Sequence, residues 1–257
     1  MKPNKSLGQH WLKDEHALNE IAACANIQSE DTILEIGPGL GTLTSVLAKK
    51  AKHVIALEFD KSLARNLKKS FKNSNVEIVE GDILSFDLTS LPAGYKVVAN
   101  VPYYITAKII QLLTTSSNPP TIAVLLVQKE VAERLAASPG KLSILGVSAQ
   151  YFAEVSLGEI VPAELFTPPP KVDSRVVILK TRQAPLFPDI QQIDFFKTMK
   201  AGFSSKRKKL RSSLSGGLSI DKKDAEILLE KANIDSGLRA EALTLEQWAA
   251  LSRIIKT

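Results

Sequence analysis

The sequence predicts an α/β protein: a mostly parallel, seven-stranded, doubly wound sheet with a small all-helical domain after it. Short apolar and β-branched runs alternate with helix-like segments over residues 32–181, which is the pattern of βαβ units. The segment Gln183–Pro188 carries two prolines and no periodicity, and the pattern beyond it is helical to the end. We therefore expect one domain over residues 1–183 and a second over residues 184–257.

Seven segments have the composition of β-strands. The first five are apolar at nearly every position, as is typical of strands that helices cover on both faces. Further along, Phe166–Pro170 ends in three prolines and is expected to form a rigid, extended loop between the last two strands. The predicted strands are Thr32–Ile36, His53–Leu57, Val76–Val79, Lys96–Val101, Thr121–Val127, Tyr151–Val161 and Ser174–Thr181.

Four segments between these strands have helical character. Asp60 and Thr106 each stand immediately before one of them, and both residue types favour the N-cap position. The predicted helices are Leu43–Lys50, Lys61–Phe71, Ala107–Thr115 and Lys129–Ala137.

The composition bounds the possible functions. The 257 residues are 44% hydrophobic and 23% charged, which is ordinary for a globular protein. The single cysteine, Cys24, excludes an intrachain disulfide, and its place in an apolar helical pattern favours core packing. The three histidines are scattered without metal-ligand spacing, so we expect no metal. We also expect no signal peptide, no membrane segment, a cytoplasmic location and a monomer.

Positive charge is concentrated near the C-terminal third of the chain. The formal net charge is +6, and five of the basic residues crowd the segment Lys206–Arg211. Such a run is either a solvated face or a contact surface for an anionic partner.

A glycine-rich turn follows the first predicted strand. Gly37, Gly39 and Gly41 allow a tight turn and a close approach of a ligand at the carboxyl edge of the sheet. Dinucleotide-binding sites require a small residue at the position that Thr42 occupies here. The spacing, with Glu35 before it, instead resembles the first motif of S-adenosylmethionine (SAM)-dependent methyltransferases.

Two further acids stand at the ends of the next strands. Glu58 lies 21 residues after Gly37, where a carboxylate can accept both ribose hydroxyls. Asp82 follows the third predicted strand, where it can accept from the amino group of the cofactor's adenine. Either acid alone is more simply a solvated residue, but their succession along one sheet edge favours a binding crevice.

A short segment after the fourth strand has the chemistry of a clamp for an amino group. Asn100 offers a carbonyl oxygen, the Pro102 carbonyl is the expected second acceptor, and Tyr103 offers a flat face for a nucleobase. Taken alone, Asn100-Val101-Pro102-Tyr103 could also be an ordinary turn.

Together these segments resemble the ribosomal RNA adenine N6,N6-dimethyltransferase family (bacterial KsgA type) over nearly the whole chain. The clamp is similar to the family's Asn-Leu-Pro-Tyr signature, with Val101 in place of leucine. The arm Lys5–Leu12 is similar to its Gly-Gln-Asn/His-Phe-Leu entry segment. Val127–Arg134, Phe166–Ser174 and the basic helical tail Phe203–Leu210 resemble three further family segments.

The resemblance implies a Rossmann-like methyltransferase domain and SAM-dependent dimethylation of two adjacent adenosines near the 3′ end of small-subunit (16S) rRNA. The implied partner is the assembling small ribosomal subunit. By the same resemblance, the SAM site is lined by His10, Leu12, Gly37, Glu58, Asp82 and Asn100.

The expected chemistry is direct methyl transfer to adenine N6. The two acceptors on Asn100 and Pro102 would orient the amine, so that no strong general base is needed. Tyr103 would stack on the target base. Phe166 either holds the other face of that base or belongs to the core, and Lys206 and Arg207 are expected to contact rRNA phosphates.

The sequence also allows other interpretations. A nicotinamide-dependent oxidoreductase would use a similar sheet, but Thr42 and the lack of an acid/base pair disfavour it. An RNA-binding assembly factor would keep the fold without the chemistry. DNA or protein-amide methyltransferases and the large-subunit rRNA adenine methylases carry related clamps.

Overall fold

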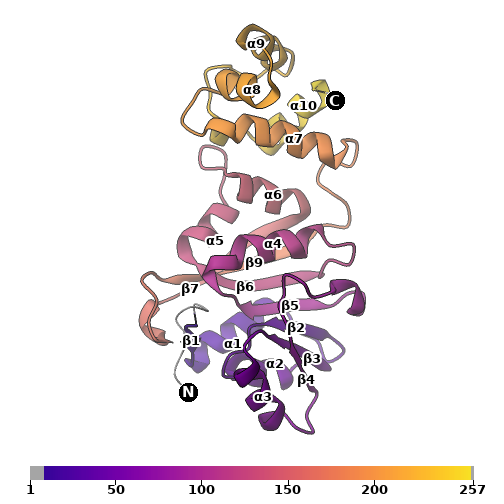
Figure 1. Cartoon of the computed structure of the whole chain (residues 1–257), viewed down its shortest axis with the longest axis vertical. Coiled ribbons are helices and arrows are strands. Elements are labelled where there is room, and N and C mark those ends of the chain that lie inside the picture. The colour runs from indigo at the N-terminus through magenta and orange to yellow at the C-terminus, as the bar shows by residue number, and fades with distance from the viewer. Residues whose placement is uncertain (1–8, 256–257) are drawn as a thin grey trace. The chain divides into compact units, whose positions relative to one another are not determined.

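The computed structural model describes residues 9–255, which divide into two compact units (Figure 1). The first unit ends at Glu133 and resumes over Ala153–Thr181. The second is formed by Arg134–Phe152 and by the chain from Arg182 onward. The sequence analysis placed all residues up to 183 in the first domain. The division differs because residues 134–152 share their apolar core with the C-terminal helices.

A seven-stranded, mostly parallel sheet forms the centre of the first unit, as the sequence predicts. Its strand order is β4-β3-β2-β5-β6-β9-β7, with β9 antiparallel to both of its neighbours. The strands are β2 (Thr32–Ile36), β3 (His53–Glu58), β4 (Val76–Glu80), β5 (Lys96–Asn100), β6 (Ile122–Gln128), β7 (Ala153–Val161) and β9 (Ser174–Thr181).

The strand order contains a topological switch between β2 and β5. From β2 the chain runs outward through β3 to β4 and then returns to β5 on the other side of β2. Connections on the two sides of a switch point diverge, and a crevice opens at the carboxyl ends of the strands. The segments after Ile36, Glu58, Glu80 and Asn100 all reach this edge.

Helices pack against the sheet through alternate strand residues. Leu18 and Ile21 of α1 and Leu47 of α2 share one apolar cluster with Val54 and Val98 of the strands. Because β2, β3, β5 and β6 are nearly all buried, continuous apolar runs were enough to predict them. The helices of this unit are α1 (Glu15–Cys24), α2 (Thr42–Ala48), α3 (Lys61–Ser70), α4 (Thr106–Thr115) and most of α5 (Lys129–Leu135).

One of the two predicted N-caps is confirmed. Asp60 accepts hydrogen bonds from the backbone amides of Ser62 and Leu63 at the start of α3. The prediction for Thr106 is wrong, because this residue is already helical and α4 begins at it. A 3-10 turn over Tyr103–Ile105 leads directly into α4, so this helix has no side-chain cap.

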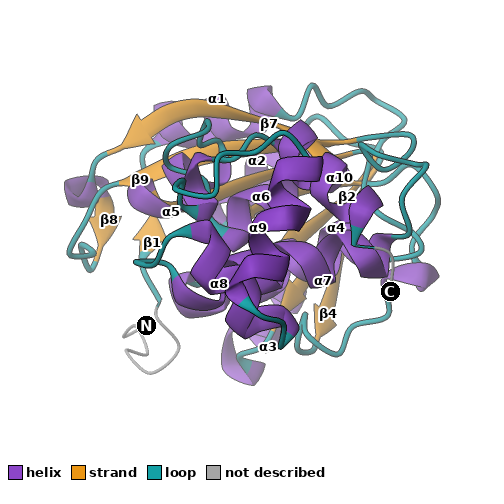
Figure 2. Cartoon of the chain, turned by 90° about the horizontal axis from the view of Figure 1, so that it is seen from above, coloured by secondary structure: helices purple, strands orange, loops and turns teal. Residues whose placement is uncertain are grey.

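Two short strands that the sequence analysis missed tie the N-terminal arm to the proline-rich loop. Strand β1 (Trp11–Leu12) pairs antiparallel with β8 (Phe166–Thr167), separately from the large sheet (Figure 2). The pairs are Trp11 with Thr167 and Leu12 with Phe166. Lys5, Leu7 and Gly8 of the arm lie outside the described residues.

The second unit is helical and has a core of its own. Tyr151, Phe195, Met199 and Trp248 are buried in one cluster, and the rings of Tyr151 and Phe195 stack at 4.6 Å. Tyr151 was predicted to begin a strand, but it lies in a helix because its ring completes this aromatic core. The helices are α6 (Ile144–Phe152), α7 (Gln192–Gly202), α8 (Leu210–Leu218), α9 (Lys222–Lys231) and α10 (Leu245–Ile254).

Short 3-10 turns complete the described chain, at Leu88–Ser90, Tyr103–Ile105, Ala163–Leu165, Phe203–Ser205 and Ala240–Ala242. Among residues 9–255, no helix is long and apolar enough to cross a membrane.

Candidate active site

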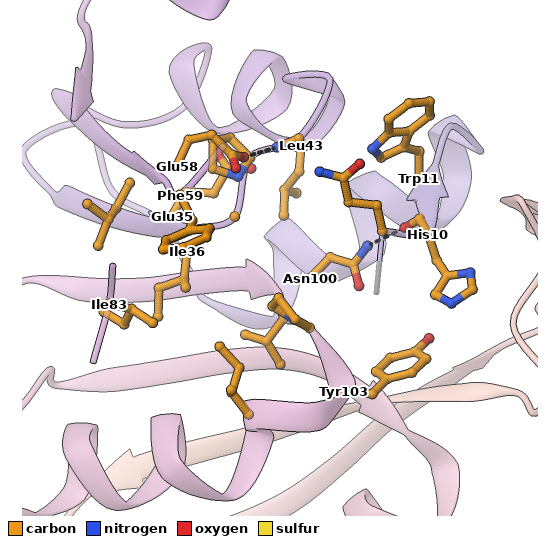
Figure 3. Close-up of a pocket in the computed structure, with 18 of the residues that line it drawn as sticks. His10, Trp11, Glu35, Ile36, Leu43, Glu58, Phe59, Ile83, Asn100 and Tyr103 are labelled. Carbon is orange, nitrogen blue, oxygen red and sulfur yellow. Dashed lines mark hydrogen bonds between the residues drawn. The ribbon is translucent and has the colours of Figure 1, made fainter. Parts of the chain in front are cut away.

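A cavity of about 410 Å³ opens in the first unit at the switch point (Figure 3). Its size is in the range of pockets that hold nucleoside-sized ligands. The glycine-rich turn, the ends of β3 and β5, the segment after β4 and the N-terminal arm all line it. Eight site residues predicted from the sequence therefore line one cavity: His10, Leu12, Gly37, Glu58, Asp82, Asn100, Pro102 and Tyr103.

The glycine-rich turn is held in a conformation that side chains would disturb. Gly41 has φ +80°, and a Cβ there would lie 2.8 Å from atoms of both Leu67 and Phe71. Gly39 has φ +59°, and its missing Cβ leaves room for the Trp11 ring at 3.3 Å. The turn therefore depends on glycine both for its backbone angles and for the close packing around it.

Glu58 is buried and fixed by backbone amides. One of its oxygens accepts from Gly39 at 3.0 Å and the other accepts from Asp60 at 2.8 Å. Burial raises the pKa of this carboxyl, and the two amides limit the rise. Each oxygen keeps a further lone pair, so Glu58 can still accept from a diol at the cavity wall.

Glu35 lies deeper, on β2, and is only 1% exposed. Burial raises the pKa of this carboxyl to about 8. Glu35 Oε2, the Thr44 hydroxyl and the Trp11 indole nitrogen are buried without a hydrogen-bond partner among the described residues. Glu35 and Trp11 line the cavity, and unpartnered buried polar atoms are expected where a polar ligand binds.

The far end of the cavity has apolar walls beside Asp82. Asp82 accepts from the backbone amide of Leu84 at 2.9 Å and keeps its other carboxylate oxygen. Phe59, 58% exposed, and the buried Ile83 also line this end (Figure 3). The sequence analysis missed both, although an aromatic directly after the strand-end Glu58 was a usable signal.

The N-terminal arm closes over the cavity through polar contacts. His10 Nδ1 lies 2.8 Å from the Pro168 carbonyl, and the Thr42 hydroxyl donates to the Leu12 carbonyl at 2.8 Å. The backbone carbonyl of His10 accepts from Asn100 Nδ2 at 3.2 Å (Figure 3). The arm thus contacts the glycine turn, the proline-rich loop and the clamp at once.

The orientation of the Asn100 amide follows from this contact. A backbone carbonyl can only accept, so the atom of Asn100 that faces His10 must be the NH₂ group. The carbonyl oxygen Oδ1 then points away from the arm. No hydrogen bond to Oδ1 occurs within the described residues, which leaves it as a free acceptor at the cavity wall.

The Pro102 carbonyl is not the free second acceptor that the sequence analysis expected. It accepts from the Ile105 amide at 3.2 Å and from the Thr106 hydroxyl at 3.4 Å. Both contacts arise because the chain turns into a 3-10 helix immediately after Pro102. Val101 also lines the cavity, and no described residue donates to its carbonyl.

Tyr103 is held rigidly at the cavity. Its hydroxyl lies 2.6 Å from the Ser174 hydroxyl, and its ring stacks on His10 with centroids 5.8 Å apart. Burial raises the pKa of this phenol, so it stays neutral at physiological pH. The ring is a fixed planar surface rather than an ionisable group.

Phe166 belongs to the core. It is 2% exposed, lies in the apolar cluster that contains Leu12 and Leu18, and does not line the cavity. The expectation that it holds a substrate base is therefore wrong in this structure. Pairing of β1 with β8 buries the ring, and that pairing was not visible in the sequence.

Lys206 and Arg207 lie in the helical unit, between Ser205 and α8. Both are exposed, and no described residue forms an ion pair with either. Their neighbour Arg211, in contrast, pairs with Glu226. Among residues 9–255, no group of three or more His, Cys, Asp and Glu side chains is arranged to hold a metal ion.

Comparisons with known proteins identify relatives along the whole chain. Residues 1–257 match the family model described as ribosomal RNA adenine dimethylase. A protein of Dehalococcoides mccartyi named ribosomal RNA small subunit methyltransferase A is 38% identical, over 98% of this chain and 88% of its own. One of the same name from Acaryochloris marina is 41% identical, over 98% of this chain and 96% of its own.

Two solved structures share the fold over nearly the full length. A dimethyladenosine transferase from Plasmodium falciparum is 28% identical with a TM-score of 0.79, over 94% of this chain and 96% of that one. The 23S rRNA methyltransferase ErmE is 27% identical with a TM-score of 0.77, over 95% of this chain and 99% of that one.

Proposed function

The chain belongs to the ribosomal RNA adenine dimethylase family, and from this premise we propose that it transfers methyl groups from SAM to adenine N6 in small-subunit rRNA. In this proposal the product is N6,N6-dimethyladenosine at two adjacent positions near the 3′ end. The substrate is the assembling small subunit in the cytoplasm, and the protein acts as a monomer. The small-subunit assignment is supported by relatives of that name at 38–41% identity, against 27% for the 23S enzyme.

The cavity fits SAM in size and in chemistry. Glu58 offers lone pairs for the ribose hydroxyls, and Phe59 and Ile83 form a slot for an adenine ring beside Asp82. The unpartnered atoms of Glu35 and Trp11 belong to residues that line the same cavity, where an amino acid moiety would need polar contacts. When bound, SAM supplies an electrophilic methyl group on a sulfonium.

The observation that carries the proposal is the fixed amide of Asn100. Its Nδ2 is bound by the arm, so its Oδ1 is the atom that can accept one hydrogen of an exocyclic amine. The lone pair of adenine N6 is delocalised into the ring and is therefore a weak nucleophile. Accepting its hydrogens favours a pyramidal nitrogen with the lone pair aimed at the methyl group.

We assign the second acceptor to the Val101 carbonyl in place of Pro102. It belongs to the residue next to Asn100 and lines the same cavity without an internal donor. Pro102 keeps a structural role, because its ring fixes φ and its carbonyl begins the 3-10 turn. After the first methyl transfer the nitrogen loses a proton to solvent and keeps one N–H, so one of the two acceptors suffices for the second transfer.

The remaining roles concern the RNA. Tyr103 provides the surface on which the target base stacks once it leaves its own stack. Lys206 and Arg207 are exposed cations without ion-pair partners among the described residues, as phosphate contacts require.

The test uses unmethylated small subunits, labelled SAM and mapping of the modified nucleotides. The parent should give N6,N6-dimethyladenosine, and Asn100→Ala should lose at least a hundredfold in rate. Asn19→Ala removes an exposed amide from α1 and serves as the matched control. Labelling at another nucleotide would refute the proposed substrate positions. RNA binding without any labelling would indicate an RNA-binding assembly factor. Parent-like turnover by Asn100→Ala would refute the role of the clamp.

A further inference from the structure

The two tyrosines of the 3-10 turn after the clamp have very different surroundings. Tyr103 is fixed by Ser174 and His10, as described above. Tyr104 is 63% exposed, and its side chain has no ring contact or hydrogen bond with any other described residue. A large aromatic in water beside an active site is a candidate contact for a ligand.

Lys108 stands four residues after Tyr104, in the first turn of α4. The 3-10 turn over Tyr103–Ile105 leads directly into this helix. Lys108 is exposed, and its ammonium forms no ion pair within residues 9–255. Both side chains line the cavity, which places a flat ring and an unpaired cation at the rim of the same pocket.

We propose that Tyr104 and Lys108 form a subsite for the nucleotide next to the target adenosine: the ring stacks on the neighbouring base and the ammonium contacts its phosphate. This inference rests on the proposed function. When a base leaves its stack, the adjacent base loses a stacking partner and its phosphate is brought to the pocket entrance. An aromatic face and a cation satisfy these two needs.

The subsite also bears on the adjacency of the two targets. If two neighbouring adenosines are modified, the nucleotide on Tyr104 is the other target while the first occupies the pocket. Because the second target nucleotide is held on the Tyr104 ring, its base enters the pocket from a fixed distance. The subsite therefore favours a target adenosine that has an unpaired neighbour over an isolated adenosine.

The test uses a substrate in which one of the two target adenosines is replaced by 2-aminopurine. This base lacks the 6-amino group and cannot be methylated there, and stacking quenches its fluorescence. With the parent we expect quenching on binding and methylation of the remaining adenosine. With Tyr104→Ala we expect the quenching to be lost and the KM for RNA to rise about tenfold. The Kd for SAM should stay unchanged, measured by calorimetry without RNA.

Companion variants separate stacking from charge. Tyr104→Phe should behave as the parent, because it keeps the ring. Lys108→Ala should raise the KM for RNA and reduce its salt dependence, whereas Lys72→Ala removes an exposed charge beyond α3 and should do neither. On a substrate with an abasic site beside the target, Tyr104→Ala should have no additional effect.

The inference is overturned if Tyr104→Ala leaves both fluorescence and RNA KM unchanged while the parent dimethylates its substrate. An altered SAM Kd would instead assign Tyr104 to the cofactor. Reduced binding to assembled subunits with unchanged kinetics on RNA fragments would assign it to a protein contact. If the parent itself does not methylate adenine, the proposed function fails, which is a different result.

Discussion

We expect the difference in stability between Glu35→Gln and the parent to depend on pH. The difference should favour the variant more at high pH than at low pH. Burial raises the pKa of Glu35 to about 8 from 4.5. The folded state therefore keeps a proton that the unfolded state releases over this range. The contribution of Glu35 to the stability of the parent therefore falls as the pH rises from about 4.5 to about 8. Glutamine has nearly the same shape and never ionises, so this loss disappears in the variant.

The size of the effect follows from the two pKa values. With 4.5 for the unfolded chain and about 8 for the folded chain, one proton changes stability by about 2.5 kcal/mol between roughly pH 5.5 and 7.5. Urea unfolding of the parent and of Glu35→Gln at these two pH values measures the difference directly. The comparison cancels the other titrating groups, because both proteins carry them.

Glu230→Gln, at an exposed position on α9, is the control, and it should shift stability about equally at both pH values. A Glu35→Gln difference that is also the same at both values would refute the reasoning. It would mean that Glu35 is ionised in the folded protein, with a partner that the burial argument does not include.

Three further predictions test packing around the site and in the helical unit. Gly41→Ala should destabilise the protein by roughly 2–4 kcal/mol, because φ is +80° and the new Cβ would overlap two side chains; chemical denaturation measures it. Tyr103→Phe should lose about 1 kcal/mol of stability with the Ser174 hydrogen bond but keep most activity, whereas inactivity would show that the hydroxyl takes part in the reaction. In the helical unit, Gly216→Ala should stabilise by roughly 0.5–1 kcal/mol because its Cβ meets open space. Gly202→Ala should destabilise because its Cβ collides with a buried indole, and equal melting temperatures for this pair would contradict the packing argument.

The central sheet could be predicted because its strands are buried on both faces. Val97–Ala99 and Ala123–Val127 are apolar without interruption, and such runs leave few alternatives. The strands β1 and β8 could not be predicted, since two-residue strands carry no periodicity. Helix α6 was missed for another reason: its residues are apolar on several sides, and Tyr151 fitted the start of the following strand equally well.

The structure brings together all the residues predicted to bind the cofactor, but it changes the surroundings of two of those predicted for the substrate. Gly37, Glu58 and Asp82 stand at strand ends, so the sheet topology alone brings them together. Phe166 and the Pro102 carbonyl depend on contacts that only the fold reveals. The Phe166 ring is covered by the N-terminal arm, and the Pro102 carbonyl accepts a hydrogen bond within a 3-10 turn.

The contact between His10 and Asn100 links the two halves of the site. The same residue fixes the arm through its ring, at the Pro168 carbonyl, and fixes the clamp through its backbone carbonyl. If the arm were displaced, Asn100 would lose the acceptor that distinguishes its oxygen from its nitrogen. The amide could then rotate by 180° and present NH₂ where the proposed clamp requires an acceptor. In the proposed mechanism, order in the arm is therefore a condition for recognising the amine, although no residue of the arm needs to touch the target base.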